Sequence, residues 1–412
     1  MKLQTPKGFR DFLPQDALKR KAVLDRIISI YQKFGFDPLE TPTVEYEETL
    51  KGKYGEEEKL IYSFETLGGD KLALRYDQTV PLVRVIAQWG PAGAQKIILP
   101  FKRYQIQSAF RGENPQKGRY REFLQCDADT IGISSPLVDA ELLALAYEIY
   151  QSLGLEVIIK VNDRALLSEF TPKHLSAIDK LNKIGTDGVI SQLESKGMTG
   201  SEAAQALEKI KSLRPSENLG EAMKTFEKMG YPKNVLKFDP TLVRGLDYYT
   251  GMIMEVVLKE DANSQSLAGG GRYDKIIGQF TGTDIPASGF SVGFDRTIEV
   301  LEQKNLIEPL LTNTLVLIAL NSPSFEVKAL KVLSLLRSLS INTEIWLDSN
   351  TKLEKQLKFA DLKGIQYVVI IGLTAQETED EVILKDLLSR TQETVRISEI
   401  YNKVKSSELG NP

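Results

Sequence analysis

Apolar residues recur along the chain at intervals that predict both helices and strands. Between 15 and 34, Leu24, Ile27 and Tyr31 fall on one face of a predicted helix. Gly35 follows this segment, at the position where a helix commonly ends. Short apolar runs that predict strands lie at 36–39, 71–74, 155–161, 235–239 and 252–258.

Two longer apolar runs, 97–106 and 120–131, predict a pair of strands. The connection 112–118 is rich in glycine, asparagine and proline, so the pair is expected to form an antiparallel hairpin with a long loop. Residues 137–153 predict a helix that ends at Gly154. The glycine run Ala268–Asp274 is interpreted as a tight turn.

The residue composition and the predicted elements change at two points along the chain. Residues 170–232 are rich in lysine, glutamate, serine and alanine at helical spacing, which predicts a helical insertion. Residues 1–169 and 233–304 are expected to form one core, and 305–313 a linker. Strands predicted at 315–320, 343–346 and 367–371 alternate with helices at 325–339 and 353–363, so 314–412 predicts a compact α/β unit.

The composition excludes several classes of protein and site. The chain has 412 residues, 42% of them apolar, and carries a net charge of −4, which is typical of a soluble globular protein with two or three domains. No run of about 18 apolar residues predicts a membrane span. With one cysteine, Cys126, and one histidine, His174, neither a disulfide, a zinc site nor a histidine-based triad is expected. Cys126 is interpreted as a small buried apolar residue, and the expected location is cytoplasmic.

Candidate anion-binding residues are arginines rather than a phosphate-binding loop. Neither Gly-x-x-x-x-Gly-Lys-[Ser/Thr] nor Gly-x-Gly-x-x-Gly occurs after a predicted strand. Six lysines and arginines lie between 102 and 121, opposed there only by Glu113. We expect side-chain cations beside glycines or strand ends to hold any nucleotide phosphate: Arg111, Arg119, Arg244 and Arg296.

The octapeptide 244–251, Arg-Gly-Leu-Asp-Tyr-Tyr-Thr-Gly, places a cation, a carboxylate and two phenols between two glycines. Glycine permits a ligand to approach the backbone, and tyrosine combines a polar hydroxyl with a water-excluding ring. Taken alone, the segment is equally compatible with ordinary packing at a strand end.

Together these segments resemble the class II aminoacyl-tRNA synthetases, and among them the histidine-specific family. Residues 110–123 resemble motif 2, 289–296 motif 3, and 8–14 with 36–42 the N-terminal segment and motif 1. Residues 244–251 and 270–274 resemble the two histidine-specific motifs. The resemblance covers essentially the whole chain.

This resemblance implies an α+β catalytic core built on an antiparallel sheet with flanking helices, a helical insertion, and a C-terminal α/β anticodon-binding domain. The implied activity is ATP-dependent activation of L-histidine and its transfer to the 3′ end of histidine tRNA. Magnesium is expected to accompany ATP, without metal ligands from the chain. A homodimer is implied, because motif 1 forms the interface in this family.

The roles of individual residues also follow from the resemblance. Arg111 and Arg244 are implied as the catalytic cations at the α-phosphate. The implied histidine pocket consists of Asp77, Thr79, Gln125, Asp129, Arg244, Tyr248, Tyr249 and Tyr273, with Tyr249 and Asp129 on the two imidazole nitrogens. The implied ATP site consists of Arg111, Glu113, Arg119, Phe123 and Arg296.

Some residues depart from the family pattern. Asp77 and Asp129 stand where many bacterial members carry glutamate, and Asn114 stands where an arginine is common. Motif 3 reads Phe-Asp-Arg rather than Leu-Glu-Arg. A non-aminoacylating paralogue, the regulatory subunit of ATP phosphoribosyltransferase, is the alternative, but it typically lacks the anticodon-binding domain. A synthetase for another amino acid is the third interpretation, against which Tyr248, Tyr249 and Tyr273 argue.

Overall fold

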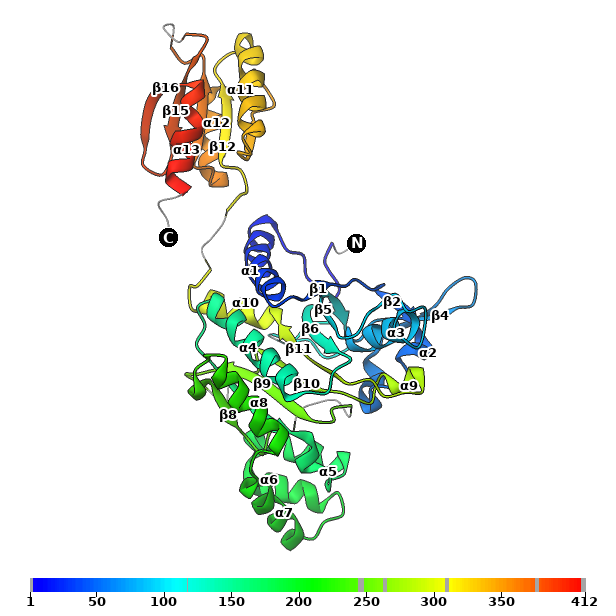
Figure 1. Ribbon diagram of the computed structural model, residues 1–412. Helices are drawn as coiled ribbons and strands as arrows, with labels where there is room; N and C mark the ends of the chain where they lie inside the picture. The colour runs from blue at the N-terminus through cyan, green and yellow to red at the C-terminus, as the bar shows by residue number, and fades with distance from the viewer. Residues whose placement is uncertain are drawn as a thin grey trace. The chain divides into compact units, whose positions relative to one another are not determined.

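A computed structural model describes residues 3–116, 118–243, 248–261, 265–307, 311–374 and 378–408 (Figure 1). Its contacts divide the chain into two compact units. The first unit comprises Met1–Asp11 and Val23–Ile307, and the second comprises Phe12–Ala22 and Glu308–Pro412. Within the described ranges, no helix combines the length and apolar character required to cross a membrane.

The first unit is built on an eight-stranded sheet with the order β1-β5-β6-β11-β10-β9-β7-β8. Its strands are β1 (Asp37–Pro38), β5 (Phe101–Phe110), β6 (Glu122–Ile131), β7 (Val157–Asp163), β8 (Leu236–Phe238), β9 (Met252–Leu258), β10 (Ala268–Arg272) and β11 (Ala287–Gly293). Neighbouring strands are antiparallel except at the two edges, where β1 pairs with β5 and β8 with β7 in parallel. The predicted α+β core on a mainly antiparallel sheet is confirmed.

The predicted hairpin lies in this sheet next to the edge strand β1. β5 and β6 pair antiparallel from Phe101↔Ile131 to Phe110↔Glu122, and the long loop between them closes the hairpin. The strand expected at 97–106 begins later, after Pro100, because proline has no N–H to donate to the sheet. The hairpin is therefore shifted toward the loop relative to the prediction.

Alternation along the strands gives the sheet two different faces. On one face, Cys126, Ala128, Phe290 and Val292 join a buried apolar core that also contains Ile27. Helices that contribute residues to this core are α1 (Pro14–Lys33) from Val23 onward, α4 (Pro136–Ser152), α8 (Glu217–Lys228) and α10 (Phe294–Gln303). The opposite face carries polar side chains, so it is available for chemistry. Cys126 is fully buried, which confirms its interpretation as a core residue.

The expected glycine turn at 268–274 is wrong, because residues 268–272 form β10 in the middle of the sheet. A Cβ on Gly270 would lie 2.1 Å from the Gly289 carbonyl oxygen. A Cβ on Gly271 would lie 2.4 Å from the Met252 carbonyl oxygen and 3.0 Å from the Tyr249 ring. These glycines permit close approach of neighbouring strands and of a tyrosine, rather than a change of chain direction.

The insertion contains a small core of its own. Helices α5 (Pro172–Ile178), α6 (Leu181–Glu194) and α7 (Gly200–Ser212) share buried residues that include Leu193 and Leu207. Helix α8, which lies within the predicted insertion 170–232, contributes Leu219 and Phe226 to the main core and packs against α4. The helical character of 170–232 is confirmed, whereas its helices divide between two cores.

A second small sheet adjoins the main one in this unit. It has the order β2-β4-β3, with β2 (Val44–Tyr46), β3 (Ser63–Glu65) and β4 (Lys71–Leu74). The short helices α2 (Glu47–Leu50) and α9 (Gly278–Thr281) contact α3 (Thr79–Trp89), whose apolar side chains fill the space between them. This arrangement fixes the start of α3, where the implied pocket residues Asp77 and Thr79 lie just before the helix and at its first position.

The C-terminal part of the second unit is a five-stranded sheet with the order β13-β12-β14-β15-β16. Its strands are β12 (Val316–Leu320), β13 (Thr343–Ile345), β14 (Tyr367–Ile371), β15 (Glu381–Asp386) and β16 (Thr391–Arg396). Its helices are α11 (Glu326–Ser338), α12 (Leu353–Lys363) and α13 (Ile400–Glu408). The predicted alternation is confirmed through β14, and β15, β16 and α13 complete the fold beyond it.

Candidate active site

The polar face of the large sheet forms the floor of a cavity of about 660 Å³. Residues at every second position of β6, β11 and β10 point to the same face, because side chains alternate along a strand. The implied site residues that line this cavity are Asp77, Thr79, Arg111, Arg119, Gln125, Asp129, Tyr248, Tyr249, Tyr273 and Arg296. The tertiary structure therefore brings together residues separated by up to 219 positions, from 77 to 296.

At one end of the cavity, Asp77 stands directly before α3. Its Oδ1 accepts hydrogen bonds from the Tyr54 hydroxyl at 2.9 Å and from the backbone N–H groups of Thr79 at 3.0 Å and Val80 at 3.2 Å. Its Oδ2 is buried and has no hydrogen-bond partner among the described residues. Burial raises the pKa of Asp77, while Arg111 opposes this. The carboxylate is thus held rigidly, with one oxygen available to a ligand.

Asp129 lies on β6 and is bound from two sides. Its carboxylate accepts a hydrogen bond from the Tyr273 hydroxyl and forms an ion pair with Arg103, whose guanidinium nitrogen is 2.8 Å from Oδ2. Arg103 lies opposite Asp129 on β5 and is completely buried. Burial raises the pKa of Asp129, and Arg103 opposes this. A Cβ on Gly289 would lie 2.0 Å from Oδ1, so this glycine provides the space for the carboxylate.

Three tyrosines form an aromatic cluster beside these carboxylates. The Tyr248 ring centroid is 4.9 Å from that of Tyr249 and 5.9 Å from that of Tyr273, both in edge-to-face contact. Burial raises the pKa of Tyr248 and Tyr273 well above the usual value, so both phenols stay protonated at neutral pH. This end of the cavity therefore combines acidic acceptors with phenol hydroxyls and ring faces, which suits a small polar ring.

Arg111 connects the acidic end of the cavity to the cationic end. Its guanidinium carbon is 4.3 Å from the Tyr76 ring centroid and 5.0 Å from the Phe123 ring centroid. Its Nε donates a hydrogen bond to the Tyr76 carbonyl oxygen at 3.2 Å. Two ring contacts and one backbone bond hold the guanidinium in a fixed orientation, as required of a group that stabilises developing charge.

Arg119 and Arg296 line the other end of the cavity. Arg119 is 53% exposed and lies 3.7 Å from the Glu113 carboxylate. Arg296 donates to the Ser266 carbonyl oxygen, and its Nε is 3.6 Å from the position of a Cβ on Gly118. The hairpin loop and the start of α10 therefore bring two guanidinium groups into one region, where an extended polyanion could bind.

The aspartate of the unusual Phe-Asp-Arg sequence helps to fix this region. Asp295 forms an ion pair with Arg10 at 2.8 Å and accepts a hydrogen bond from the Leu124 N–H at 3.4 Å. The Arg10 guanidinium carbon also lies 3.2 Å from the Tyr120 ring centroid. The shorter acidic side chain thus connects the N-terminal segment, the hairpin and α10 immediately before Arg296.

Two of the implied site residues that the structure describes, Phe123 and Glu113, are not among the residues that line the cavity. Phe123 packs against Arg111, so it forms support for the cavity wall. Glu113 lies near Arg119 and uses its carbonyl oxygen to accept a hydrogen bond from Arg121 at 3.0 Å. Arg244 lies outside the described residues, and its role remains a prediction.

Sequence reasoning missed several charged residues that line the cavity, including Asp127, and it did not identify Arg103 as the partner of Asp129. Asp127 and Arg103 lie on the polar face of the sheet, where Asp127 occupies the position between Gln125 and Asp129 on β6. The sequence could have identified Asp127, because residues 125, 127 and 129 lie on the same face of a strand. Arg103 was counted only as one member of a basic segment, because its pairing with Asp129 requires the register of the hairpin.

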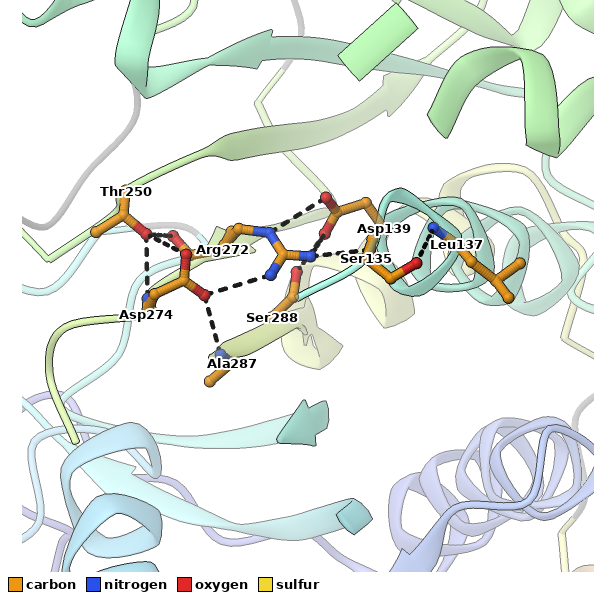
Figure 2. A network of polar contacts seen from close by, with 8 residues as sticks. All are labelled: Ser135, Leu137, Asp139, Thr250, Arg272, Asp274, Ala287 and Ser288. Carbon is orange, nitrogen blue, oxygen red and sulfur yellow. Dashed lines mark hydrogen bonds and ion pairs between the residues drawn. The ribbon is translucent and has the colours of Figure 1, made fainter. Parts of the chain in front are cut away.

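A network of polar contacts includes residues adjacent in sequence to Tyr249 and Tyr273 (Figure 2). Arg272 donates two hydrogen bonds to the Asp139 carboxylate, at 3.3 and 3.0 Å, and one to Asp274 at 3.3 Å. The Ser288 hydroxyl donates to Asp139 at 2.9 Å, and the Thr250 hydroxyl donates to Asp274 at 3.1 Å. The network thereby fixes β10, α4, β11 and the segment after Tyr249 relative to one another.

Replacing Arg272 with methionine is expected to lower the free energy of unfolding by about 3–5 kcal/mol, because Asp139 would remain buried without its cation. Urea unfolding measures this change. Lys259→Met is the matched control, since its ion pair with Glu156 is solvent-exposed and should contribute little. Combining Arg272→Met with Asp139→Leu should recover much of the loss, and a double variant as unstable as the single one would contradict the ion-pair explanation.

No described group of three or more histidine, cysteine, aspartate or glutamate side chains is placed to hold a metal ion.

Comparison with known proteins places the chain in a family. The family model described as histidyl-tRNA synthetase matches residues 8–297, and the model described as anticodon binding domain matches residues 314–407. The first of these covers the eight-stranded sheet, the insertion and the whole cavity. The second covers the five-stranded sheet and its helices, which confirms the anticodon-binding fold predicted for the C-terminal unit.

Individual relatives agree with these matches. The chain is 46% identical to histidine–tRNA ligase of Aeropyrum pernix over 71% of its own length and 73% of the relative's. It is 39% identical to histidine–tRNA ligase of Nanoarchaeum equitans, covering 96% of this chain and 97% of the relative. The crystal structure of histidyl-tRNA synthetase from Nostoc sp. superposes with a TM-score of 0.85 at 28% identity, covering 99% of this chain and 100% of that one.

Proposed function

Because the chain belongs to the histidyl-tRNA synthetase family of class II aminoacyl-tRNA synthetases, we propose that the cavity binds L-histidine at its acidic end and ATP at its arginine-lined end. The enzyme would then form histidyl-adenylate and transfer histidine to its tRNA. The observation that supports this proposal is the single cavity with buried acceptors at one end and guanidinium groups at the other.

At the acidic end, the free Oδ2 of Asp77 and the hydroxyl of Thr79 would bind the α-ammonium group of histidine. Asp129 and Tyr249 would bind the two imidazole nitrogens, and Tyr248 and Tyr273 would enclose the ring. Gln125 would face the carboxylate, because it lies on β6 toward Arg111 and away from Asp129. Partners at fixed positions would reject a ring that lacks either nitrogen.

At the other end, Arg119 and Arg296 would bind the β- and γ-phosphates, and Arg111 the α-phosphate. Glu113 would contact the adenine edge and Phe123 the adenine face. Arg244 would join Arg111 at the α-phosphate, on the strength of the family resemblance. Magnesium would bind with ATP through phosphate oxygens, where it would add positive charge beside the arginines.

The first step requires no general base, because the carboxylate of histidine is already ionised. One of its oxygens attacks the α-phosphorus, and the bond between that phosphorus and the pyrophosphate oxygen breaks. Negative charge that develops on the α-phosphate oxygens is stabilised by the fixed guanidinium of Arg111. In the second step, a hydroxyl of the 3′-terminal adenosine attacks the carbonyl carbon, and AMP leaves.

A homodimer and a cytoplasmic location are parts of the same proposal. The support for the homodimer is the resemblance of residues 36–42 to motif 1, which forms the interface in this family. The substrates implied by the family, tRNA and ATP, support the location.

ATP–pyrophosphate exchange with each of the twenty amino acids tests the proposed function. Exchange with histidine alone is the expected result, since the acidic and phenolic partners suit an imidazole. Exchange that depends on another amino acid would overturn the assignment. Histidine binding without exchange would instead favour the regulatory paralogue, which the match of 314–407 to an anticodon-binding domain argues against.

Deleting residues from 314 onward is expected to preserve histidine activation and to reduce tRNA charging by a factor of ten or more (about 1.4 kcal/mol of binding free energy). The cavity and its supporting core lie within 1–307, whereas the deleted part has a separate core. Exchange and charging assays on the same preparation measure both effects. Undiminished charging would show that this part does not contribute to tRNA binding.

A further inference from the structure

Asp127 lies in the middle of the cavity floor and has no role in the assignments made so far. It faces the cavity from β6, opposite Gln105 on β5 and Ser291 on β11. The residue is 4% exposed, and its Oδ1 has no hydrogen-bond partner within the described ranges. A buried carboxylate oxygen without a partner is costly, so its retention at a ligand-facing position requires a reason.

Asp127 lies among buried cations that already have other partners. Arg103 acts on Asp127, but its guanidinium forms an ion pair with Asp129. Arg75 also interacts with Asp127, but its guanidinium donates a hydrogen bond to the Gln107 side chain at 2.8 Å. Burial, with a further contribution from Asp129, raises the pKa of Asp127 to about 7. A bound cation would provide the partner that Oδ1 of Asp127 lacks.

The position of Asp127 indicates which part of histidine it would meet. Side chains on one face of a strand are separated by about 7 Å, so Asp127 is one such step from both Gln125 and Asp129. In the proposed pose, Gln125 faces the carboxylate of histidine and Asp129 faces its ring. The α-ammonium group lies between these two parts of the substrate, and it is cationic at neutral pH, whereas the imidazole is mostly neutral.

We propose that Asp127 is a specificity-determining residue that binds the α-ammonium group of the amino-acid substrate together with Asp77. Oδ1 of Asp127 and Oδ2 of Asp77 would accept two of the three ammonium N–H groups, and Thr79 the third. The pocket thereby requires a free α-amino group as well as an imidazole. This inference rests on the proposed binding of histidine in the cavity.

Steady-state exchange with Asp127→Asn tests the inference, because asparagine keeps the shape of the side chain and removes its charge. Loss of a charge-assisted hydrogen bond is expected to raise the KM for histidine about 10–100-fold without changing the KM for ATP. L-histidinol, which keeps the ammonium group, should lose inhibition by the same factor. Imidazole-4-propionate, which lacks the ammonium group, should inhibit the wild type and the variant equally.

One control variant and three possible outcomes make the test decisive. Asp361→Asn changes an exposed aspartate on α12, so it should leave all three ligands unaffected. Equal weakening of imidazole-4-propionate would place Asp127 at the ring or in a supporting role and overturn the inference. An unchanged KM for histidine would overturn it as well. The proposed function fails separately, if the wild-type protein itself shows no histidine-dependent exchange.

The pH profile provides a second readout that a supporting role would not produce. Ionisation of Asp127 depends on the charged and polar groups that act on it: Arg103 on β5, Asp129 on the same strand, Ser291 on β11, Asp77 before α3 and Arg75 after β4. With a pKa of about 7, the carboxyl group is mainly neutral at about pH 6 and ionised at about pH 8. The ratio of variant to wild-type KM should therefore rise with pH, since titration of histidine itself cancels. A constant ratio would contradict the proposal.

Discussion

Replacing Arg111 with alanine is expected to lower the rate of histidine-dependent exchange about 10²–10³-fold, comparable to the loss of an oxyanion-stabilising donor. Arg111 reaches the cavity between the acidic pocket and the other arginines, and the Tyr76 and Phe123 rings hold its guanidinium in place. A charge fixed in this way stabilises the α-phosphate in the transition state without reorganisation. Pre-steady-state formation of the adenylate measures the effect directly.

Two companion variants separate charge from geometry at this position. Arg111→Lys keeps a positive charge but cannot stack between two rings or donate in a planar fork, so it should recover only part of the rate. Arg214→Ala removes an exposed arginine far along the chain and should leave exchange unchanged. Wild-type rates in Arg111→Ala would remove this residue from the mechanism.

Replacing Asp129 with asparagine is expected to raise the KM for histidine about 100-fold or more, while the KM for ATP changes little. The carboxylate is the acceptor that Tyr273 and Arg103 hold in position at the proposed ring end of the pocket. A neutral amide cannot accept from an imidazole N–H with the same strength, and it leaves Arg103 buried without its partner. Such sites discriminate by about 10⁴–10⁵ in favourable cases, because unpaired partners are penalised.

Tyr273→Phe separates substrate binding from folding in this prediction. Asp129→Asn leaves Arg103 without a countercharge, so thermal unfolding of the variant should also shift downward. Tyr273→Phe removes only one hydroxyl and keeps the ion pair, so a smaller rise in KM is expected with little change in stability. If histidine binds both variants as tightly as it binds the wild type, this end of the cavity does not hold the ring.

The spacing of apolar residues along the sequence was sufficient to predict most helices and strands. Helix spacing predicted α1 and α4 to within about two residues, and the apolar runs predicted the β5–β6 hairpin and the strands β12, β13 and β14 of the C-terminal unit. The motif residues were sufficient to identify the family, because their types and order are specific. The predicted turn at the glycine run was wrong, because the atoms that leave no room for a Cβ on Gly270 and Gly271 belong to other segments rather than to adjacent residues in the chain.

The charged residues of the cavity show why the rest of the site could not be predicted from the sequence. Whether Arg103 neutralises Asp129 depends on hairpin register, and whether Asp127 is buried depends on β11 lying alongside β6. Asp139 and Arg272 form an ion pair 133 residues apart, which no local pattern encodes. Charge balance inside a protein depends on distance and burial, and both are properties of the packed chain.

The sequence by itself therefore determined which chemical groups the protein has, in what order, and which family shares them. Only the tertiary structure decided that the carboxylates of Asp77, Asp127 and Asp129 line one cavity, with Oδ2 of Asp77 and Oδ1 of Asp127 left for a substrate. The physical reason is that the spacing of residues along the sequence assigns each side chain to one face of a strand or helix. The long-range pairing of strands and helices decides which faces meet, and therefore which buried charged groups lie close enough to pair.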